Sequence, residues 1–363
     1  MNSEKEPGFR ETLKSDMYDQ GLFRNLKNDL KDIIDFYLAP SSKEMLKKMN
    51  PFKRAFFYIF WILKSMILKL TPVRRLLLLI SILLILTANE ISFGSRHSSV
   101  TSNWDQLGGA IMLVVLMLEL KDKLLAKDEL SAGRKIQEAL MPEQNPYLDG
   151  WSVWLYSQPA NEVCGDLVDF FKPDDKRSLI LMADVAGKGL NAALVTAKLQ
   201  AMIRALAPDY TDTSLISKVN NTFYRESLRN IFSTLFYIEC FKNSSELKIV
   251  NAGHLPAFII KNNEIRELPR GNTALGLMNN AEYSLHLQEV EEGEVLVVFS
   301  DGVTEARNKR GDFFGSDRLK SLLLNKNNQS VSNIGNLIID EINHFSADSR
   351  LNDDLSLIIL KKM

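Results

Sequence analysis

The sequence has few cysteines and almost no net charge, and each shortage excludes a class of protein. Its 363 residues contain only two cysteines, which excludes a disulfide framework, and no spacing resembles a zinc site. The 44 basic and 45 acidic residues leave a net charge of −1, which gives no general attraction for nucleic acid. The polar N-terminus has no apolar core behind it, so a cleaved signal peptide is not expected.

Hydrophobic residues make up 45% of the chain and charged residues 25%, as in ordinary globular proteins. Their distribution is uneven, and it predicts four regions. We expect a cytoplasmic N-terminal helical region over 1–50, a membrane-associated region over 51–120, a connecting helix over 121–142 and a catalytic domain over 143–363. No internal repeat or low-complexity tract interrupts them.

Two apolar runs in the second region predict a transmembrane hairpin, with spans at about 74–93 and 104–120. Their uncharged cores, Leu76 to Asn89 and Gln106 to Leu118, are shorter than the roughly 20 residues that a span needs. The alternative is therefore a soluble helical pair or an oligomerisation motif.

The charges around these runs favour the membrane. Basic residues cluster before the first run, so the positive-inside rule places residues 91–103 outside and the rest in the cytoplasm. Arg74 and Arg75 could reach the lipid headgroups, and Trp104 lies where an interfacial aromatic is expected. Segment 55–70, apolar with interspersed lysines, fits a helix on the inner leaflet. We therefore expect an inner-membrane protein that has the lipid membrane as a partner and its catalytic domain in the cytoplasm.

The connecting helix carries an apolar pattern between alternating charges. Leu124, Leu130, Ile136 and Leu140 recur at roughly helical intervals, and Pro142 ends the pattern. This pattern favours pairing in a coiled coil and hence a homodimer. The alternative is a passive spacer.

From Trp151 onward the chain predicts an α+β fold. Strands are expected over 151–157, 178–184, 233–241, 246–251, 257–261, 294–300 and 355–360. Helices are expected over 190–206, 214–228, 317–324 and 332–345. Consecutive strands without intervening helices indicate antiparallel sheets covered by helices.

Acidic residues stand at the ends of several apolar strands. An aspartate at the end of a buried strand is costly unless something positive neutralises it, and a hard divalent cation is the economical partner. Oxygen-only ligation suits magnesium or manganese. The acidic residues in question are Asp166, Asp169, Asp184, Asp301, Asp353 and Asp354.

Three other residues allow competing interpretations. Cys164 is not followed by the arginine of a cysteine-phosphatase loop, so it is not expected to be a nucleophile. Lys188 lies in a Gly-Lys-Gly stretch without Walker spacing, and it either assists phosphate binding or is simply solvated. His254 could act as a general acid or hold the neighbouring carboxylates, although stabilisation of its Asn-Ala-Gly-His turn is favoured.

The ordered set of motifs resembles a known family. Residues 162–166, 183–189, 251–254, 300–306 and 353–356 are similar to the motifs of bacterial SpoIIE/RsbU-type serine phosphatases, a branch of the metal-dependent phosphatase 2C-like (PPM) superfamily. The resemblance covers about residues 134–363 and not residues 1–120. It implies a two-layer antiparallel β-sandwich flanked by helices, with two Mn²⁺ or Mg²⁺ ions between the sheets. One departure is Cys164, where the family commonly has glycine.

The resemblance also implies roles for individual residues. Asp184 would bridge both metals, and the Val185 carbonyl would contact one of them. Asp301 and Asp353 would complete the shell of the first metal, and Asp166 would lie by the second, through water. Asp184 and Asp301 are thereby the expected catalytic residues.

For two further aspartates the resemblance implies no definite metal-binding role. Asp354 could exchange roles with Asp353, and Asp169 is expected to be structural. The implied reaction is attack of a metal-activated hydroxide on phosphorus, without a protein nucleophile.

The implied function is that of a membrane-anchored protein serine/threonine phosphatase. Its substrate would be a phosphorylated STAS-type anti-anti-sigma regulator. A catalytically inactive membrane scaffold that binds the same partner is the alternative. A nucleotide-using enzyme with two metals is a third interpretation, but the sequence lacks a purine-cradling loop.

Overall fold

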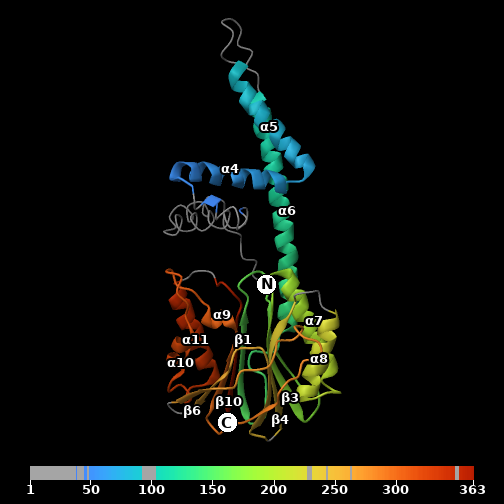
Figure 1. Ribbon diagram of the computed structural model, residues 1–363, viewed down its shortest axis with the longest axis vertical. Helices are drawn as coiled ribbons and strands as arrows, with labels where there is room; N and C mark the ends of the chain where they lie inside the picture. Colours follow the sequence, from blue (N-terminus) through green and yellow to red (C-terminus); the bar gives the residue numbers. More distant parts are fainter. Residues whose placement is uncertain are drawn as a thin grey trace, which may run out of the picture. The chain divides into compact units, whose positions relative to one another are not determined.

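The computed structural model describes residues 38, 45–46, 49–91, 104–226, 231–242, 244–261, 264–347 and 351–363 (Figure 1). The chain divides into two compact units, Met1–Lys123 and Leu124–Met363. Most of the helical region expected over 1–50, and nearly all of the connection expected outside the membrane over 91–103, lie outside the described residues.

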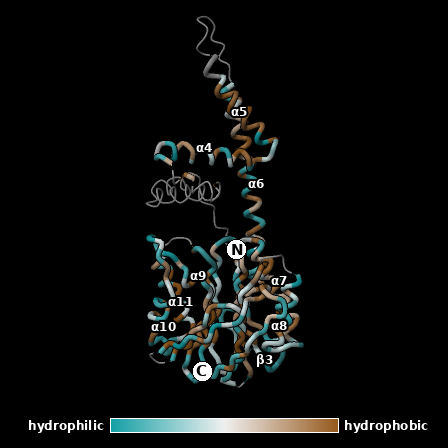
Figure 2. Tube along the Cα trace, viewed as in Figure 1, coloured by the Kyte–Doolittle hydropathy of each residue, from teal (hydrophilic) through white to brown (hydrophobic). Residues whose placement is uncertain are grey.

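Helices make up the described part of the first unit. They are α4 (Pro51–Lys69), α5 (Pro72–Ile91) and the first half of α6 (Trp104–Leu140). Hydrophobic residues are concentrated on α5 (Figure 2). Helices α5 and α6 approach closely at Gly108, because a Cβ there would lie 2.7 Å from the carbonyl oxygen of Ser81.

The predicted transmembrane hairpin is wrong. Within the described ranges, no helix combines the length and the apolar character that crossing a membrane requires. The uncharged cores fall short of the roughly 20 residues of a span. Arg74, expected at the lipid headgroups, instead pairs with Glu119 at 2.8 Å and with Asp122 at 2.7 Å. The expected inner-membrane location is contradicted by the same finding.

Two five-stranded antiparallel sheets form the second unit. Sheet A has the order β1 (Trp151–Gln158), β10 (Leu355–Lys362), β9 (Val295–Phe299), β6 (Phe258–Lys261) and β7 (Glu264–Glu267). Sheet B has the order β2 (Asp166–Phe171), β3 (Arg177–Val185), β4 (Ser233–Phe241), β5 (Glu246–Ala252) and β8 (His286–Glu289). One buried cluster draws residues from both sheets and lies between them.

Helices cover the outer faces of both sheets, as predicted for an α+β sandwich (Figure 1). On sheet B, α7 (Leu190–Leu206) and α8 (Asp212–Glu226) bury a second apolar cluster. On sheet A, α9 (Asp301–Thr304), α10 (Ser316–Leu323) and α11 (Val331–Ser346) bury a third. The connecting helix predicted over 121–142 is the second half of α6.

Four short elements were not predicted, namely β2, β7, β8 and α9. Strand β2 has the sequence Asp-Leu-Val-Asp-Phe-Phe, in which Asp166 and Asp169 interrupt the apolar pattern expected of a buried strand. Both carboxylates are nevertheless buried in the structure. Strands β7 and β8 have four residues each, too few to show an alternating pattern.

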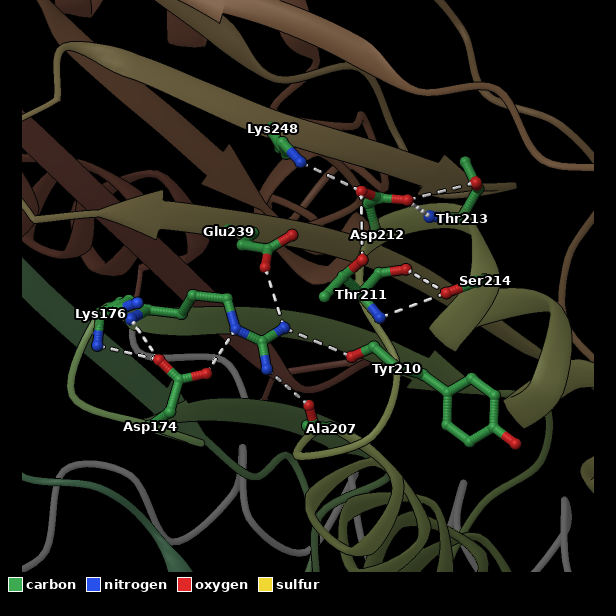
Figure 3. A network of polar contacts seen from close by, with 11 residues as sticks. Asp174, Lys176, Ala207, Tyr210, Thr211, Asp212, Thr213, Ser214, Glu239 and Lys248 are labelled. Carbon is green, nitrogen blue, oxygen red and sulfur yellow. Dashed lines mark hydrogen bonds and ion pairs between the residues drawn. The ribbon is translucent and has the colours of Figure 1, made fainter.

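Figure 3 shows a network of polar contacts that includes Asp174, Ala207 and Glu239, all three of which are partners of the buried side chain of Arg177. The guanidinium of Arg177 donates to Glu239 at 3.1 Å, to Asp174 at 2.6 Å and to the Ala207 carbonyl at 2.9 Å. Glu239 is fully buried on β4. Arg177 thus pairs with a buried carboxylate of β4 and also donates a hydrogen bond to the C-cap residue of α7.

Candidate active site

Strand pairing in sheet B brings the first two aspartates together. Asp166 begins β2 and is the direct partner of Asp184, near the end of β3. Residues opposite each other in an antiparallel pair have their Cα atoms about 4.5–5.5 Å apart, so two carboxylates share one end of the sheet. On its other side Asp184 pairs with Thr234 of β4.

Sheet A supplies the other aspartates from the end of β9 and the start of β10. Asp301 begins α9 directly after β9. Ser300 ties the two strands, because its hydroxyl donates to the Asp354 carbonyl and accepts from the Ser356 N–H, both at 3.0 Å. Gly302 permits this approach, since a Cβ there would overlap the Asp354 carbonyl oxygen.

The side chain of Asp354 connects the two sheets. Its carboxylate accepts the backbone N–H groups of Ala160 at 2.7 Å and Gly165 at 2.5 Å, with a longer contact of 3.4 Å from Asp166. A Cβ on Gly165 would meet both this carboxylate at 3.5 Å and the Val185 carbonyl oxygen at 3.8 Å. The Val185 carbonyl therefore faces the same small space.

The carboxylates of this cluster raise one another's pKa values. Burial, and then the charges of Asp301 and Asp353, raise the pKa of Asp184 to about 7. Burial and Asp353 also raise the pKa of Asp301. Burial, followed by the charge of Asp184, raises the pKa of Asp166 well above its usual range. The site is thus short of positive charge.

These residues fit a hard divalent cation. The Oδ2 atom of Asp166 is buried without a hydrogen-bond partner, which is costly unless a ligand or ion completes it. The donors at the site are carboxylates and one carbonyl, the ligands that magnesium and manganese prefer. In the described part of the chain, no three acidic, cysteine or histidine side chains already stand around a common point. The fit therefore rests on the donor set and on the unpartnered oxygen.

The structure separates the two adjacent aspartates that the sequence left interchangeable. Both oxygens of Asp354 accept backbone N–H groups. The Oδ1 of Asp353 accepts the N–H of Asp354 at 3.1 Å, and its Oδ2 accepts from Lys188 at 2.8 Å. The second oxygen of Asp353 is thus held by an exposed lysine side chain and not by backbone, so Asp353 is the better candidate ligand of the two.

Three further residues from the sequence analysis have structural partners. Both oxygens of the buried Asp169 carboxylate accept from Arg204, at 2.6 and 2.8 Å, as expected for a structural role. Burial raises the pKa of the Cys164 thiol, which disfavours the nucleophilic thiolate. Burial lowers the pKa of His254 to about 4, and its Nδ1 lies 2.9 Å from the Thr234 hydroxyl.

The sequence analysis missed the contacts that hold the segment before β2. The Gln137 amide of α6 donates to the Cys164 carbonyl at 2.9 Å and accepts its N–H at 3.0 Å. The Thr196 hydroxyl of α7 donates to the Gly165 carbonyl at 2.6 Å. Periodicity gives no signal for such contacts, since each partner lies at least 27 residues away. Two helices thus fix the backbone that carries Asp166.

The sequence resembles a known family and several known proteins. The family described as Stage II sporulation protein E (SpoIIE) matches residues 174–362, about half of the chain. The phosphoserine phosphatase RsbU of Bacillus subtilis is 29% identical over 240 residues, which is 65% of this chain and 70% of RsbU. Protein IcfG of Synechocystis is 28% identical over 260 residues, but the match covers only 41% of IcfG.

The fold also matches solved structures. The SiaA-PP2C domain of Pseudomonas aeruginosa superposes with a TM-score of 0.58 at 18% identity, covering 66% of this chain and 98% of that domain. The PP2C phosphatase domain of SpoIIE from Bacillus subtilis gives a TM-score of 0.52 at 17% identity, covering 60% of this chain and 64% of that structure. At these identities the likeness concerns the fold, which is that of PP2C phosphatases.

Proposed function

The chain belongs to the SpoIIE family, and on that premise we propose that it hydrolyses phosphoserine or phosphothreonine at the carboxylate cluster where its two sheets meet. As a member of this family it is a protein serine/threonine phosphatase. The observation that supports the site is the buried, unpartnered Oδ2 of Asp166 beside Asp184.

Each part of the site has a proposed role. Two Mn²⁺ or Mg²⁺ ions would supply the attacking oxygen and neutralise the phosphoryl group. Asp184 would hold both ions, with Asp301 and Asp353 on the first and Asp166 near the second. The Val185 carbonyl would add a neutral ligand. Asp354 would hold the backbone of Gly165 and Asp166 in place rather than bind an ion.

The activity can be tested on the full chain with a phosphoserine peptide. We expect hydrolysis with Mn²⁺ and none with excess EDTA. A chain that binds Mn²⁺ but releases no phosphate would support the alternative of an inactive scaffold.

The substrate is proposed to be a phosphorylated regulatory protein of the STAS type, as the family resemblance implies. Its relative RsbU is a phosphoserine phosphatase, which supports phosphoserine as the phosphate ester that is hydrolysed. A phosphorylated STAS protein should be hydrolysed with a higher kcat/KM than a short peptide containing the same phosphoserine.

Asp353 and Asp354 should respond differently to replacement by asparagine. Asp353→Asn should weaken Mn²⁺ binding and leave the stability of the metal-free protein unchanged. Asp354→Asn should lower the free energy of unfolding by about 1–3 kcal/mol, because an amide cannot accept all of the N–H groups now bound. Metal titration and urea unfolding of both variants measure this; the opposite pattern would exchange the two roles.

The metal-free protein should lose stability as the pH rises. The pKa of the Asp184 carboxyl is about 7 in the folded protein and 3.8 without the influence of the fold, so the folded state binds the proton more tightly than the unfolded state does. Its contribution to stability is present below about pH 4 and is lost by about pH 7. Mn²⁺ should therefore raise the unfolding temperature more at about pH 8 than at about pH 5, since the ligands must be deprotonated. Thermal unfolding with EDTA or Mn²⁺ at each pH tests this, and an equal shift would contradict it.

We also propose a homodimer that forms along α6. Leu124, Ile136 and Leu140 of this helix are all about half exposed or more, and Ile136 and Leu140 lie one turn apart on the same face, where a second helix could pack against them. Replacing Ile136 and Leu140 by Asp should give a monomer by light scattering, whereas Lys135→Asp, on the same helix, should not. If the wild-type chain is a monomer at micromolar concentration, the proposed homodimer is wrong and α6 is a passive spacer.

A further inference from the structure

A single lysine faces the carboxylate cluster from the loop between β3 and α7. The Nζ of Lys188 donates to Asp353 Oδ2 at 2.8 Å and to the Asn352 carbonyl at 2.9 Å. Gly187 and Gly189 on either side have φ angles of +126° and +70°. A Cβ at either glycine would meet no atom within 4 Å, so there is open space beside the backbone on both sides of Lys188.

Lys188 acts on the whole cluster and not only on Asp353. Its charge lowers the pKa values of Asp184 and Asp301, which burial and the neighbouring carboxylates raise. Its own pKa is raised, first by the hydrogen bond to Asp353 and further by the charges of Asp354 and Asp301. In the described structure, Lys188 is the cation whose charge lowers the pKa values of Asp184 and Asp301 and so opposes the repulsion among the carboxylates.

This ion pair can exchange readily. The side chains of Lys188 and Asp353 are 60% and 40% exposed, and exposed pairs of this kind contribute little to stability. A divalent cation on the Asp353 carboxylate repels the ammonium group and competes with it for the same oxygens, so it weakens this ion pair. Occupation of Asp353 would therefore release the lysine at the rim of the site, with glycines on both sides to let it turn.

We infer that Lys188 is a phosphate-binding residue that Asp353 holds until a divalent cation takes that carboxylate. This inference rests on the proposed function. A phosphoserine or phosphothreonine side chain brings about −1.5 to −2 charges and three acceptor oxygens to the same rim. A lysine ammonium binds phosphate as a point charge, which suits a residue that moves between two anions. The released lysine thus contributes to substrate binding and makes it depend on the metal.

The test uses Lys188→Gln in the full chain and measures two affinities, that for Mn²⁺ and that for orthophosphate. Direct Mn²⁺ titration of the metal-free variant should show binding about fivefold tighter, the upper range for loss of an exposed competing ion pair. Inhibition by orthophosphate at saturating Mn²⁺ should become about tenfold weaker, because a charge-assisted hydrogen bond is lost. Lys188→Arg should restore orthophosphate binding.

Lys198→Gln is the matched control, since Lys198 lies on α7 and pairs with Glu226. It should change neither measurement. Both changes in Lys188→Gln are required, and either one staying within about twofold of wild type overturns the inference. If the wild-type chain itself binds no Mn²⁺, the proposed function fails instead, so the two failures are distinguishable.

Discussion

Replacing Asp184 by asparagine is expected to lower phosphatase turnover by about 1000-fold or more, which corresponds to about 4 kcal/mol of lost transition-state stabilisation. The physical reason is the place of Asp184 in the cluster. It is the direct strand partner of Asp166, and the charges of Asp301 and Asp353 act on it from the other sheet. An amide there removes one negative charge from the ligands of both proposed ions.

The fold should survive this substitution. Burial and neighbouring carboxylates raise the pKa of Asp184, so its ionised form is disfavoured in the metal-free protein. In EDTA, the Asp184→Asn protein should therefore unfold at the wild-type temperature or slightly above it. Asp175→Asn, at an exposed position in the β2–β3 turn, is the control and should keep full turnover. Turnover of Asp184→Asn within tenfold of wild type would contradict the assignment of Asp184 as a shared metal ligand.

Part of this site could be predicted because it is encoded locally. Asp184 is the last residue but one of the apolar strand β3, and Asp301 follows the apolar strand β9 after Ser300. The pairing of Asp166 with Asp184 is not local, because it needs β2, a strand that the sequence analysis did not predict. The sequence also could not show that Asp353 and Asp354 have different contacts. Their partners, Lys188 and the N–H groups of Ala160 and Gly165, lie more than 160 residues away.

The N-terminal helices show the same limit of local information. Helical segments could be predicted from apolar runs, and α4, α5 and α6 lie where they were expected. The environment of those runs could not be predicted, since composition shows a charge but not its partner. Arg74 has the position of a headgroup-binding residue in the sequence, yet its partners are Glu119, 45 residues later, and Asp122.

Arg177 is another residue whose role depends on distant partners. In the sequence it is one basic residue of a charged turn, whereas in the fold its side chain is only 8% exposed. Its partner Glu239 is fully buried, and the second oxygen of that carboxylate has no hydrogen-bond partner. Arg177 also donates to the carbonyls of Ala207 and Tyr210, which follow α7. The buried charge of Glu239 is thus balanced by Arg177.

Replacing Arg177 by methionine should therefore lower the free energy of unfolding by about 3–5 kcal/mol, because it leaves the Glu239 carboxylate buried and unpaired. Asp174→Asn, which removes the more exposed partner, should cost no more than about 1 kcal/mol. Adding Glu239→Gln to Arg177→Met should recover part of the loss, since no buried charge then remains. Arg177 begins β3, whereas Asp184 lies near the other end of that strand. At temperatures well below the unfolding temperature, turnover per folded molecule should therefore equal that of the wild type. Urea unfolding and active-site metal titration separate these effects, and a loss below about 1 kcal/mol for Arg177→Met would show that Glu239 is not held as a charge.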